Sequence, residues 1–195
     1  MAVPRTRMCV TGPLKLKTLE PLQRDLQFFK AAMQRLARPK GLSVSPLQHG
    51  LKSSCGTSTT RRTTRWSSHS RSRWRHCNTV TDAGVLLQVD DPAISHDWEE
   101  VRRPRMNLQE YERFMMLRVE ALNAALAGIP EEMIRYHVCW GSWPGMHTED
   151  IPLSDIVKMI LRVNAQAYSI EAASRHICTN GRSGATSPSC QKARS

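Results

Sequence analysis

Acidic residues are missing from two long stretches of this 195-residue chain. Residues 34–81 contain ten lysines and arginines and residues 174–195 contain four, and neither stretch contains an aspartate or a glutamate. The formal net charge of +11 arises from these stretches, because the rest of the chain holds 14 basic and all 17 acidic residues. A basic surface throughout would favour nucleic acid as a partner, whereas this distribution indicates a slightly acidic folded part interrupted by basic segments.

Long hydrophobic runs are also lacking. No apolar run approaches the ~20 residues of a membrane-spanning helix. No hydrophobic signal segment accompanies the six cysteines, so a secreted disulfide scaffold is not favoured. We therefore expect a cytoplasmic protein in a reducing compartment, without a membrane partner.

Two parts of the chain have the apolar periodicity of a folded protein. In residues 8–33, a predicted strand end and a turn precede a predicted helix whose apolar side chains recur at helical spacing: Leu19, Leu22, Leu26, Phe29 and Met33. Residues 79–173 alternate between strand and helix patterns. The predicted elements are a strand at 85–89, a helix after the capping-box pair Asn107 and Glu110, a strand at 134–140, a helix capped by Ser154 and a strand at 167–171. This alternation is typical of a parallel α/β fold.

The two basic segments, 34–78 and 174–195, have no such periodicity. They are rich in serine, threonine and arginine. By composition we predict that both segments are disordered.

Side chains able to bind a metal follow the predicted strands. His137 and Cys139 stand at positions i and i+2, so on a strand they project from the same face. Glu171 ends the next strand, and imidazole, thiolate and carboxylate are all zinc ligands. Asp90 and Asp91 end the first strand and would hold a cationic substrate group at the same end of the sheet. Each signal has an ordinary alternative: a packed His-x-Cys pair, a solvated or helix-capping glutamate, and a turn at the two aspartates.

Three ordered motifs together resemble one family. They are Leu-Gln-Val-Asp-Asp-Pro-Ala at 87–93, His-Val-Cys-Trp-Gly-Ser at 137–142 and Asn-Ala-Gln-Ala-Tyr-Ser-Ile-Glu at 164–171. They resemble the catalytic barrel of cobalamin-independent methionine synthase, and most closely its single-barrel relatives. The resemblance runs through 79–173 and partly through 8–33. It implies an α/β fold of the (β/α)8 TIM-barrel type, and an incomplete barrel here, because a complete one takes about 250 residues.

The resemblance also implies a site and a reaction. His137, Cys139 and Glu171 match three zinc ligands, and the fourth, a cysteine, is expected beyond the end of this chain. Asp90 matches the carboxylate that holds the amino group of the thiol substrate. The implied activity is zinc-dependent methyl transfer to homocysteine in methionine biosynthesis. The implied methyl donor is 5-methyltetrahydrofolate, in the form of 5-methyltetrahydropteroyltriglutamate. Relatives alkylate other thiols, so a different thiol substrate remains the alternative.

The basic segments are consistent with a change of reading frame. When each new codon starts at the third base of the old one, permitted codons over 51–72 restore acidic residues and a helical apolar pattern. The same shift from Cys178 onward restores a sequence that resembles the family. We therefore interpret 34–78 and 174–195 as out-of-frame translation, the His176-Ile177-Cys178 triplet as an accidental copy of the zinc motif, and the chain as an inactive fragment.

A basic nucleic-acid-binding protein is the competing interpretation. Six arginines and two tryptophans of the first basic segment would contact phosphates and stack on bases: Arg61, Arg62, Arg65, Arg71, Arg73, Arg75, Trp66 and Trp74. Any peptide of this charge binds nucleic acid at low salt, so we expect no specific nucleic-acid partner.

Overall fold

The structure is a computed structural model that describes residues 17–36, 42–46, 75–98, 106–140 and 150–171. The elements in chain order are α1 (Glu20–Arg35), β1 (Leu42–Pro46), a helix at 75–82, β2 (Leu86–Asp91), α3 (Ala93–Asp97), α4 (Leu108–Leu126), a 3-10 turn (Glu131–Met133), β3 (Ile134–Val138), α5 (Leu153–Ile160) and β4 (Ala167–Ile170).

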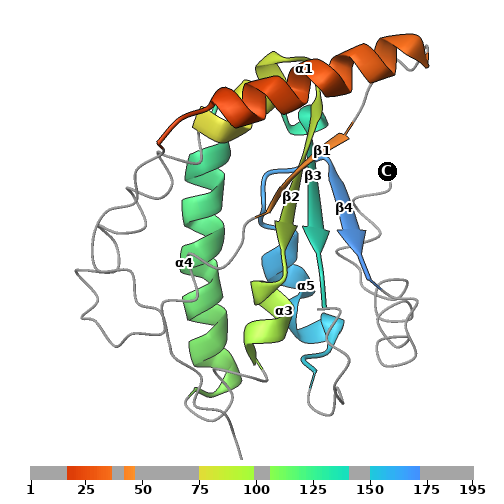
Figure 1. Cartoon of the computed structure of the whole chain (residues 1–195). Helices are drawn as coiled ribbons and strands as arrows, with labels where there is room; N and C mark the ends of the chain where they lie inside the picture. Colours follow the sequence, from red (N-terminus) through yellow and green to blue (C-terminus); the bar gives the residue numbers. More distant parts are fainter. Residues whose placement is uncertain (1–16, 37–41, 47–74, 99–105, 141–149, 172–195) are drawn as a thin grey trace, which may run out of the picture.

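The four strands form one parallel sheet in the order β1-β2-β3-β4. α4 connects β2 to β3 and α5 connects β3 to β4, and the two helices contact each other on one side of the sheet (Figure 1). The predicted α/β class with parallel strands is therefore confirmed. The described strands form an open sheet and do not close into a barrel.

The sheet has one buried face and one polar face. On β3, Ile134, Tyr136 and Val138 are buried, whereas Arg135 is exposed and His137 is half-buried. The side chains of a strand alternate between its two faces, so the buried set faces the helices and His137 lies on the polar face. Register places Asp90 of β2 and Ser169 of β4 on either side of His137.

α4 forms as its sequence predicts. Asn107 Oδ1 accepts a hydrogen bond from Glu110 N, and Glu110 Oε2 accepts one from Asn107 N, each at 3.0 Å. This capping box satisfies amide groups that the first turn of a helix leaves unpaired. The helix ends before Gly128, whose φ of +88° is accessible mainly to glycine. The apolar side chains that recur along one face of this helix are buried, namely Tyr111, Phe114, Met115, Val119, Leu122 and Leu126.

α5 departs from the prediction at its start. The helix begins at Leu153 after Pro152, and no side chain caps it. Ser154 Oγ instead donates to Asp155 Oδ1 at 3.1 Å. The prediction of a Ser154 cap is wrong, because a proline already sets the backbone one residue before the first turn.

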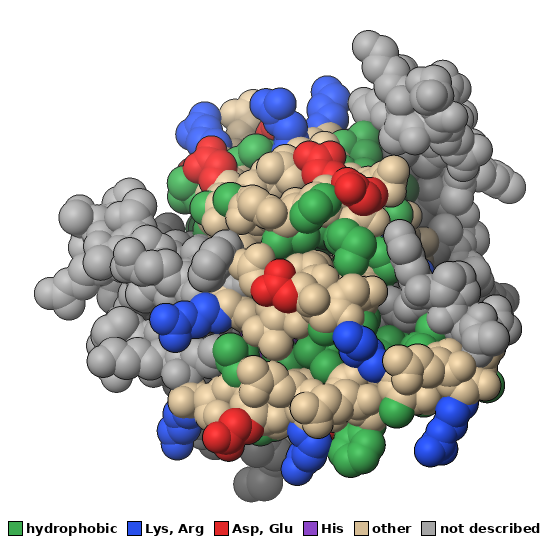
Figure 2. Space-filling view, turned by 90° about the horizontal axis from the view of Figure 1, so that it is seen from above, with side chains coloured by type: hydrophobic (Ala, Val, Ile, Leu, Met, Phe, Trp, Pro, Cys, Tyr) green, Lys and Arg blue, Asp and Glu red, His purple; other side chains and the backbone are tan. Residues whose placement is uncertain are grey.

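α1 lies across the end of the sheet where the strands begin (Figure 1). The five apolar residues predicted for one face of this helix, Leu19 to Met33, are its least exposed positions. Only Leu26 is fully buried, and Phe28 is 70% exposed. Seen from this end, hydrophobic side chains lie between lysines, arginines and acidic residues (Figure 2).

Part of the first basic segment has regular structure. β1 pairs in parallel with β2, and residues 75–78 belong to the helix at 75–82, where Cys77 is buried in the main core. The prediction of disorder throughout 34–78 is therefore wrong at these residues. Strand pairing uses the backbone N–H and C=O groups, and every residue except proline carries both. Cysteine is also a readily buried residue. The rest of 34–78, the tail 174–195 and the predicted turn at 11–13 lie outside the described residues.

Candidate metal centre

The carboxyl ends of β2, β3 and β4 meet at one end of the sheet (Figure 1). His137 lies in β3, Cys139 follows that strand by one residue, and Glu171 directly follows β4. One ligand atom from each of these three side chains lies within 4.8 Å of the other two. Asp90, on β2, is the register neighbour of His137. The structure thus brings together four of the five side chains that the sequence nominates, and Asp91 is the exception.

Three side chains of metal-ligating type gather at this point and could hold a metal ion. Zinc lies about 2.0–2.3 Å from nitrogen, oxygen and sulfur ligands, which places tetrahedral ligand atoms about 3.3–3.7 Å apart. The ligand atoms here lie within 4.8 Å of one another, which is a looser spacing than a bound zinc ion requires. All three residues are half-buried, so their side chains are partly accessible to solvent.

His137 is held by the neighbouring strand. Its Nδ1 lies 3.1 Å from the carbonyl oxygen of Ser169 and 3.2 Å from the hydroxyl of the same residue. A carbonyl can only accept, so Nδ1 donates to it and the lone pair of the neutral ring lies on Nε2. Nε2 is 3.7 Å from Asp90 Oδ1. In this tautomer the lone pair of Nε2 lies on the side of Asp90 and would be available to a metal ion.

Burial raises the pKa of the Asp90 carboxyl above its ordinary value of 3.8. The nearby His137 lowers this pKa, and the neighbouring carboxylates of Asp91 and Glu171 raise it further. Desolvation and like charges both disfavour the ionised carboxyl. A positive group bound beside Asp90 would therefore be stabilised by its carboxylate and would reverse the shift.

Glu171 is fixed from the end of β3. Its Oε2 accepts a hydrogen bond from the backbone N–H of Trp140 at 2.8 Å. Trp140 is itself buried, and its indole N–H donates to the carbonyl of Ile151 at 3.4 Å. This residue therefore packs in the core while its backbone orients the glutamate.

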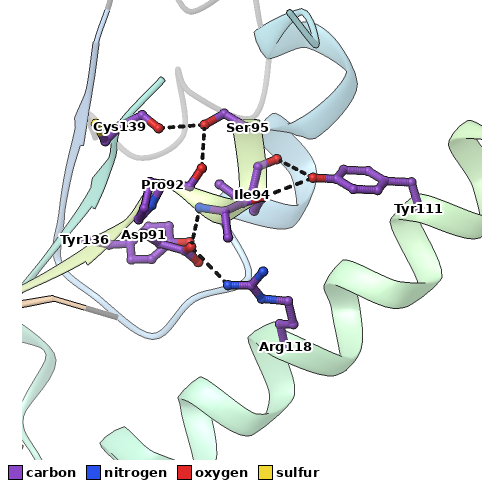
Figure 3. A network of polar contacts seen from close by, with 9 residues as sticks. Asp91, Pro92, Ile94, Ser95, Tyr111, Arg118, Tyr136 and Cys139 are labelled. Carbon is purple, nitrogen blue, oxygen red and sulfur yellow. Dashed lines mark hydrogen bonds and ion pairs between the residues drawn. The ribbon is translucent and has the colours of Figure 1, made fainter. Parts of the chain in front are cut away.

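Cys139 is held through its backbone. The Ser95 hydroxyl, in the middle of α3, donates to the Cys139 carbonyl at 2.6 Å and lies 3.2 Å from the Pro92 carbonyl (Figure 3). Tyr111 of α4 supports the same short helix, because its hydroxyl lies 3.1 Å from the carbonyls of Ala93 and Ile94. Ser95 is 44 residues away from Cys139 in sequence, and no local pattern predicts this contact.

Asp91 does not face the metal centre, although the sequence suggests it as a substrate anchor. Its Oδ2 accepts from the Tyr136 hydroxyl at 2.8 Å, and its Oδ1 lies 3.3 Å from Arg118 Nη2 and 3.0 Å from the Ala93 amide (Figure 3). Asp91 shares the buried face of β2 with Leu87 and Val89. The expectation for Asp91 is therefore wrong, because the strand continues through it and turns its side chain inward.

This buried network also acts on Tyr136. Burial raises the pKa of the Tyr136 hydroxyl well above its ordinary value, and the Asp91 carboxylate raises it further. Tyr136 therefore stays protonated and donates its hydrogen bond to Asp91. Arg118 and Tyr136 are supporting residues that the sequence does not single out.

Compared with known protein families, with curated proteins and with solved structures, the chain matches none. In the part of the chain that the structure describes, no helix has the length and apolar character needed to cross a bilayer. The nucleic-acid interpretation depends on six arginines and two tryptophans. Of these eight residues, Arg75 alone lies in the part of the chain that the structure describes.

Proposed function

We propose that this chain carries the zinc centre of a thiol methyltransferase similar to cobalamin-independent methionine synthase. His137, Cys139 and Glu171 are the zinc ligands, Asp90 binds the amino group of homocysteine, and 5-methyltetrahydrofolate is the methyl donor. The observation that carries the proposal is the convergence of the three ligand atoms within 4.8 Å at the carboxyl ends of adjacent parallel strands. The corresponding location is cytoplasmic.

The order of the strands supports a barrel as the parent fold. The sheet runs β1-β2-β3-β4 without reversal, and the last two connections each contain a helix on the same side. A doubly wound sheet reverses its strand order at the binding site, whereas a (β/α)8 barrel continues in one direction and binds ligands at the carboxyl ends. We infer that the described strands are part of a TIM-type barrel that is incomplete in this chain.

Each residue of the proposed site has a separate role. A bound zinc ion would supply the positive charge that keeps a substrate thiol in its reactive thiolate form. Ser169 fixes the His137 tautomer, and the Trp140 amide and the Ser95 hydroxyl fix Glu171 and the Cys139 backbone. Asp90, 3.7 Å from His137, places a cationic amino group beside the metal centre.

Three ligands bind zinc less firmly than the four that the family resemblance implies. An open site is also wet, which weakens electrostatic stabilisation of the reacting groups. We therefore propose that the chain binds zinc weakly and gives no measurable methylation of homocysteine.

The test measures zinc bound at equilibrium by dialysis and elemental analysis. We expect weak binding by the unaltered chain and loss of binding in His137→Ala and in Cys139→Ala. The matched control is His176→Ala with Cys178→Ser, which removes the other His-x-Cys triplet and should leave binding unchanged. Loss of zinc in the control alone would overturn the assignment. In a frame-restored chain, preference for a thiol other than homocysteine would keep the metal centre and change the substrate.

A further inference from the structure

One peptide group connects two of the three proposed metal ligands. It is the peptide between Cys139 and Trp140, just beyond the end of β3. Its N–H donates to Glu171 Oε2 at 2.8 Å, and its C=O accepts from the Ser95 hydroxyl at 2.6 Å. A peptide group is planar, so these two hydrogen bonds orient it from opposite sides. A rotation of this plane would disturb the Cys139 backbone and the Glu171 carboxylate together.

The Ser95 hydroxyl gives this peptide group a contact that strand pairing does not. The register of β3 with β2 and with β4 ends at Val138, one residue before Cys139. Ser95 is 1% exposed, so water does not compete for its hydroxyl. A hydroxyl has one proton, and the Cys139 carbonyl at 2.6 Å is closer than the Pro92 carbonyl at 3.2 Å. The proton is therefore donated to Cys139.

α4 in turn holds the short helix that carries Ser95. The buried Tyr111 hydroxyl lies 3.1 Å from the carbonyl oxygens of both Ala93 and Ile94. α3 has only five residues, and a helix this short is not stable by itself, so contacts from outside determine where it lies. Figure 3 shows α3 between Tyr111 and Cys139. The position of Ser95 relative to Cys139 therefore depends on Tyr111.

We propose that Ser95 is a positioning residue for the metal centre and that Tyr111 acts through it. Ser95 orients the peptide group between Cys139 and Trp140, and this peptide group orients the thiolate and the carboxylate ligand. Donation to the carbonyl also polarises the peptide group and strengthens its N–H as a donor to Glu171. The inference rests on the proposed metal centre and adds to it two residues that are not ligands.

The experiment titrates the full chain with Co²⁺ without denaturant. Thiolate-to-cobalt charge-transfer absorption reports the bond to Cys139, and the d–d bands report the arrangement of all ligands. The variants are Ser95→Ala, Tyr111→Phe and the two combined. Tyr168→Phe is the matched control, because it also removes a tyrosine hydroxyl that donates to a backbone carbonyl, that of Val163 at 2.7 Å. Urea unfolding of each protein gives the folded fraction, by which the affinity is corrected.

We expect Ser95→Ala to weaken Co²⁺ binding by the folded chain about 10- to 100-fold and to shift the d–d bands of the cobalt that still binds. Tyr111→Phe should weaken binding less, and it should add nothing in the chain that already carries Ser95→Ala. Tyr168→Phe should lower stability and leave the corrected affinity unchanged, as a purely structural residue would.

Three results would overturn the proposal or its basis. A corrected affinity and spectrum unchanged by Ser95→Ala would refute the role of Ser95, and additive losses in the combined variant would refute the route through it. Tyr111→Phe keeps the buried ring, so a corrected affinity equal to that of the unaltered chain would count against the proposal even if Ser95→Ala failed to fold. Absence of cobalt binding by the unaltered chain would instead overturn the metal centre, and this inference with it.

Discussion

Replacing Asp91 by alanine should destabilise the fold strongly, although Asp90 beside it can be replaced at little cost. Asp91 accepts hydrogen bonds from Tyr136, Ala93 and Arg118 in the buried core, and the side chains of Asp91 and Arg118 are only 5% and 3% exposed. Removing the carboxylate leaves a buried guanidinium without its ion pair. Breaking a buried pair in this way costs about 3–5 kcal/mol. An ordinary domain has a total stability of about 5–15 kcal/mol, so this loss is a large part of it.

The assay is equilibrium unfolding in urea followed by circular dichroism, with zinc absent. Asp90→Ala is the matched control, because it removes the same group from the other face of the same strand. We expect Asp90→Ala to change the free energy of unfolding by less than about 1 kcal/mol. Tyr136→Phe removes only one hydrogen bond to the carboxylate and should cost about 1.5–3 kcal/mol.

A double variant separates the buried charge from the loss of packing. Asp91→Ala with Arg118→Met removes both charges, so it should be less destabilised than the sum of the two single variants. Equal effects of Asp90→Ala and Asp91→Ala would refute the reasoning. So would strict additivity in the double variant, because the ion pair would then contribute nothing.

Three further predictions follow from the same structure. Burial raises the pKa of Asp90 above 3.8 in the folded state, so the folded chain binds more protons at this carboxyl than the unfolded chain does. The free energy of unfolding, relative to that of Asp90→Asn, should therefore fall as pH rises through and above 3.8. Urea midpoints of the two metal-free proteins are compared between about pH 3 and 7, and a constant difference would contradict the prediction. Gly128→Ala should cost about 1 kcal/mol or more, since φ is +88° although nothing lies within 4 Å of an added Cβ; an unchanged urea midpoint would contradict this strain. A chain translated in the restored frame across 34–78 and beyond 174, with its downstream coding sequence, should bind zinc tightly and methylate homocysteine; equal turnover by the unaltered chain would show that it is not damaged.

The elements with regular periodicity could be predicted from the sequence, and those that depend on distant partners could not. The apolar face of α1 and the capping box of α4 follow from spacing within one helix. β1 could not be foreseen, because it lies in a segment of polar composition and is held by backbone pairing with β2.

At the site, too, some features follow from local sequence patterns, and others depend on contacts between distant residues. His137, Cys139, Glu171 and Asp90 were predictable because each stands at or just beyond the end of an apolar strand. The different roles of Asp90 and Asp91 depend on where β2 ends. An Asp-Asp-Pro sequence suggests that the strand has already stopped, whereas the pairing of Asp91 with Val138 extends it by one residue and sends this carboxylate into the core.

Hydrogen bonds from neighbouring elements orient the three proposed ligand residues, and this affects how zinc affinity depends on stability. Contacts from β4, α3 and the chain after β3 hold His137, the Cys139 backbone and Glu171 respectively. Folding, and not metal binding, therefore bears most of the entropic cost of ordering these side chains. Zinc affinity in core variants should consequently follow the fraction of folded chain, whereas variants of the ligands should lose zinc without losing the fold.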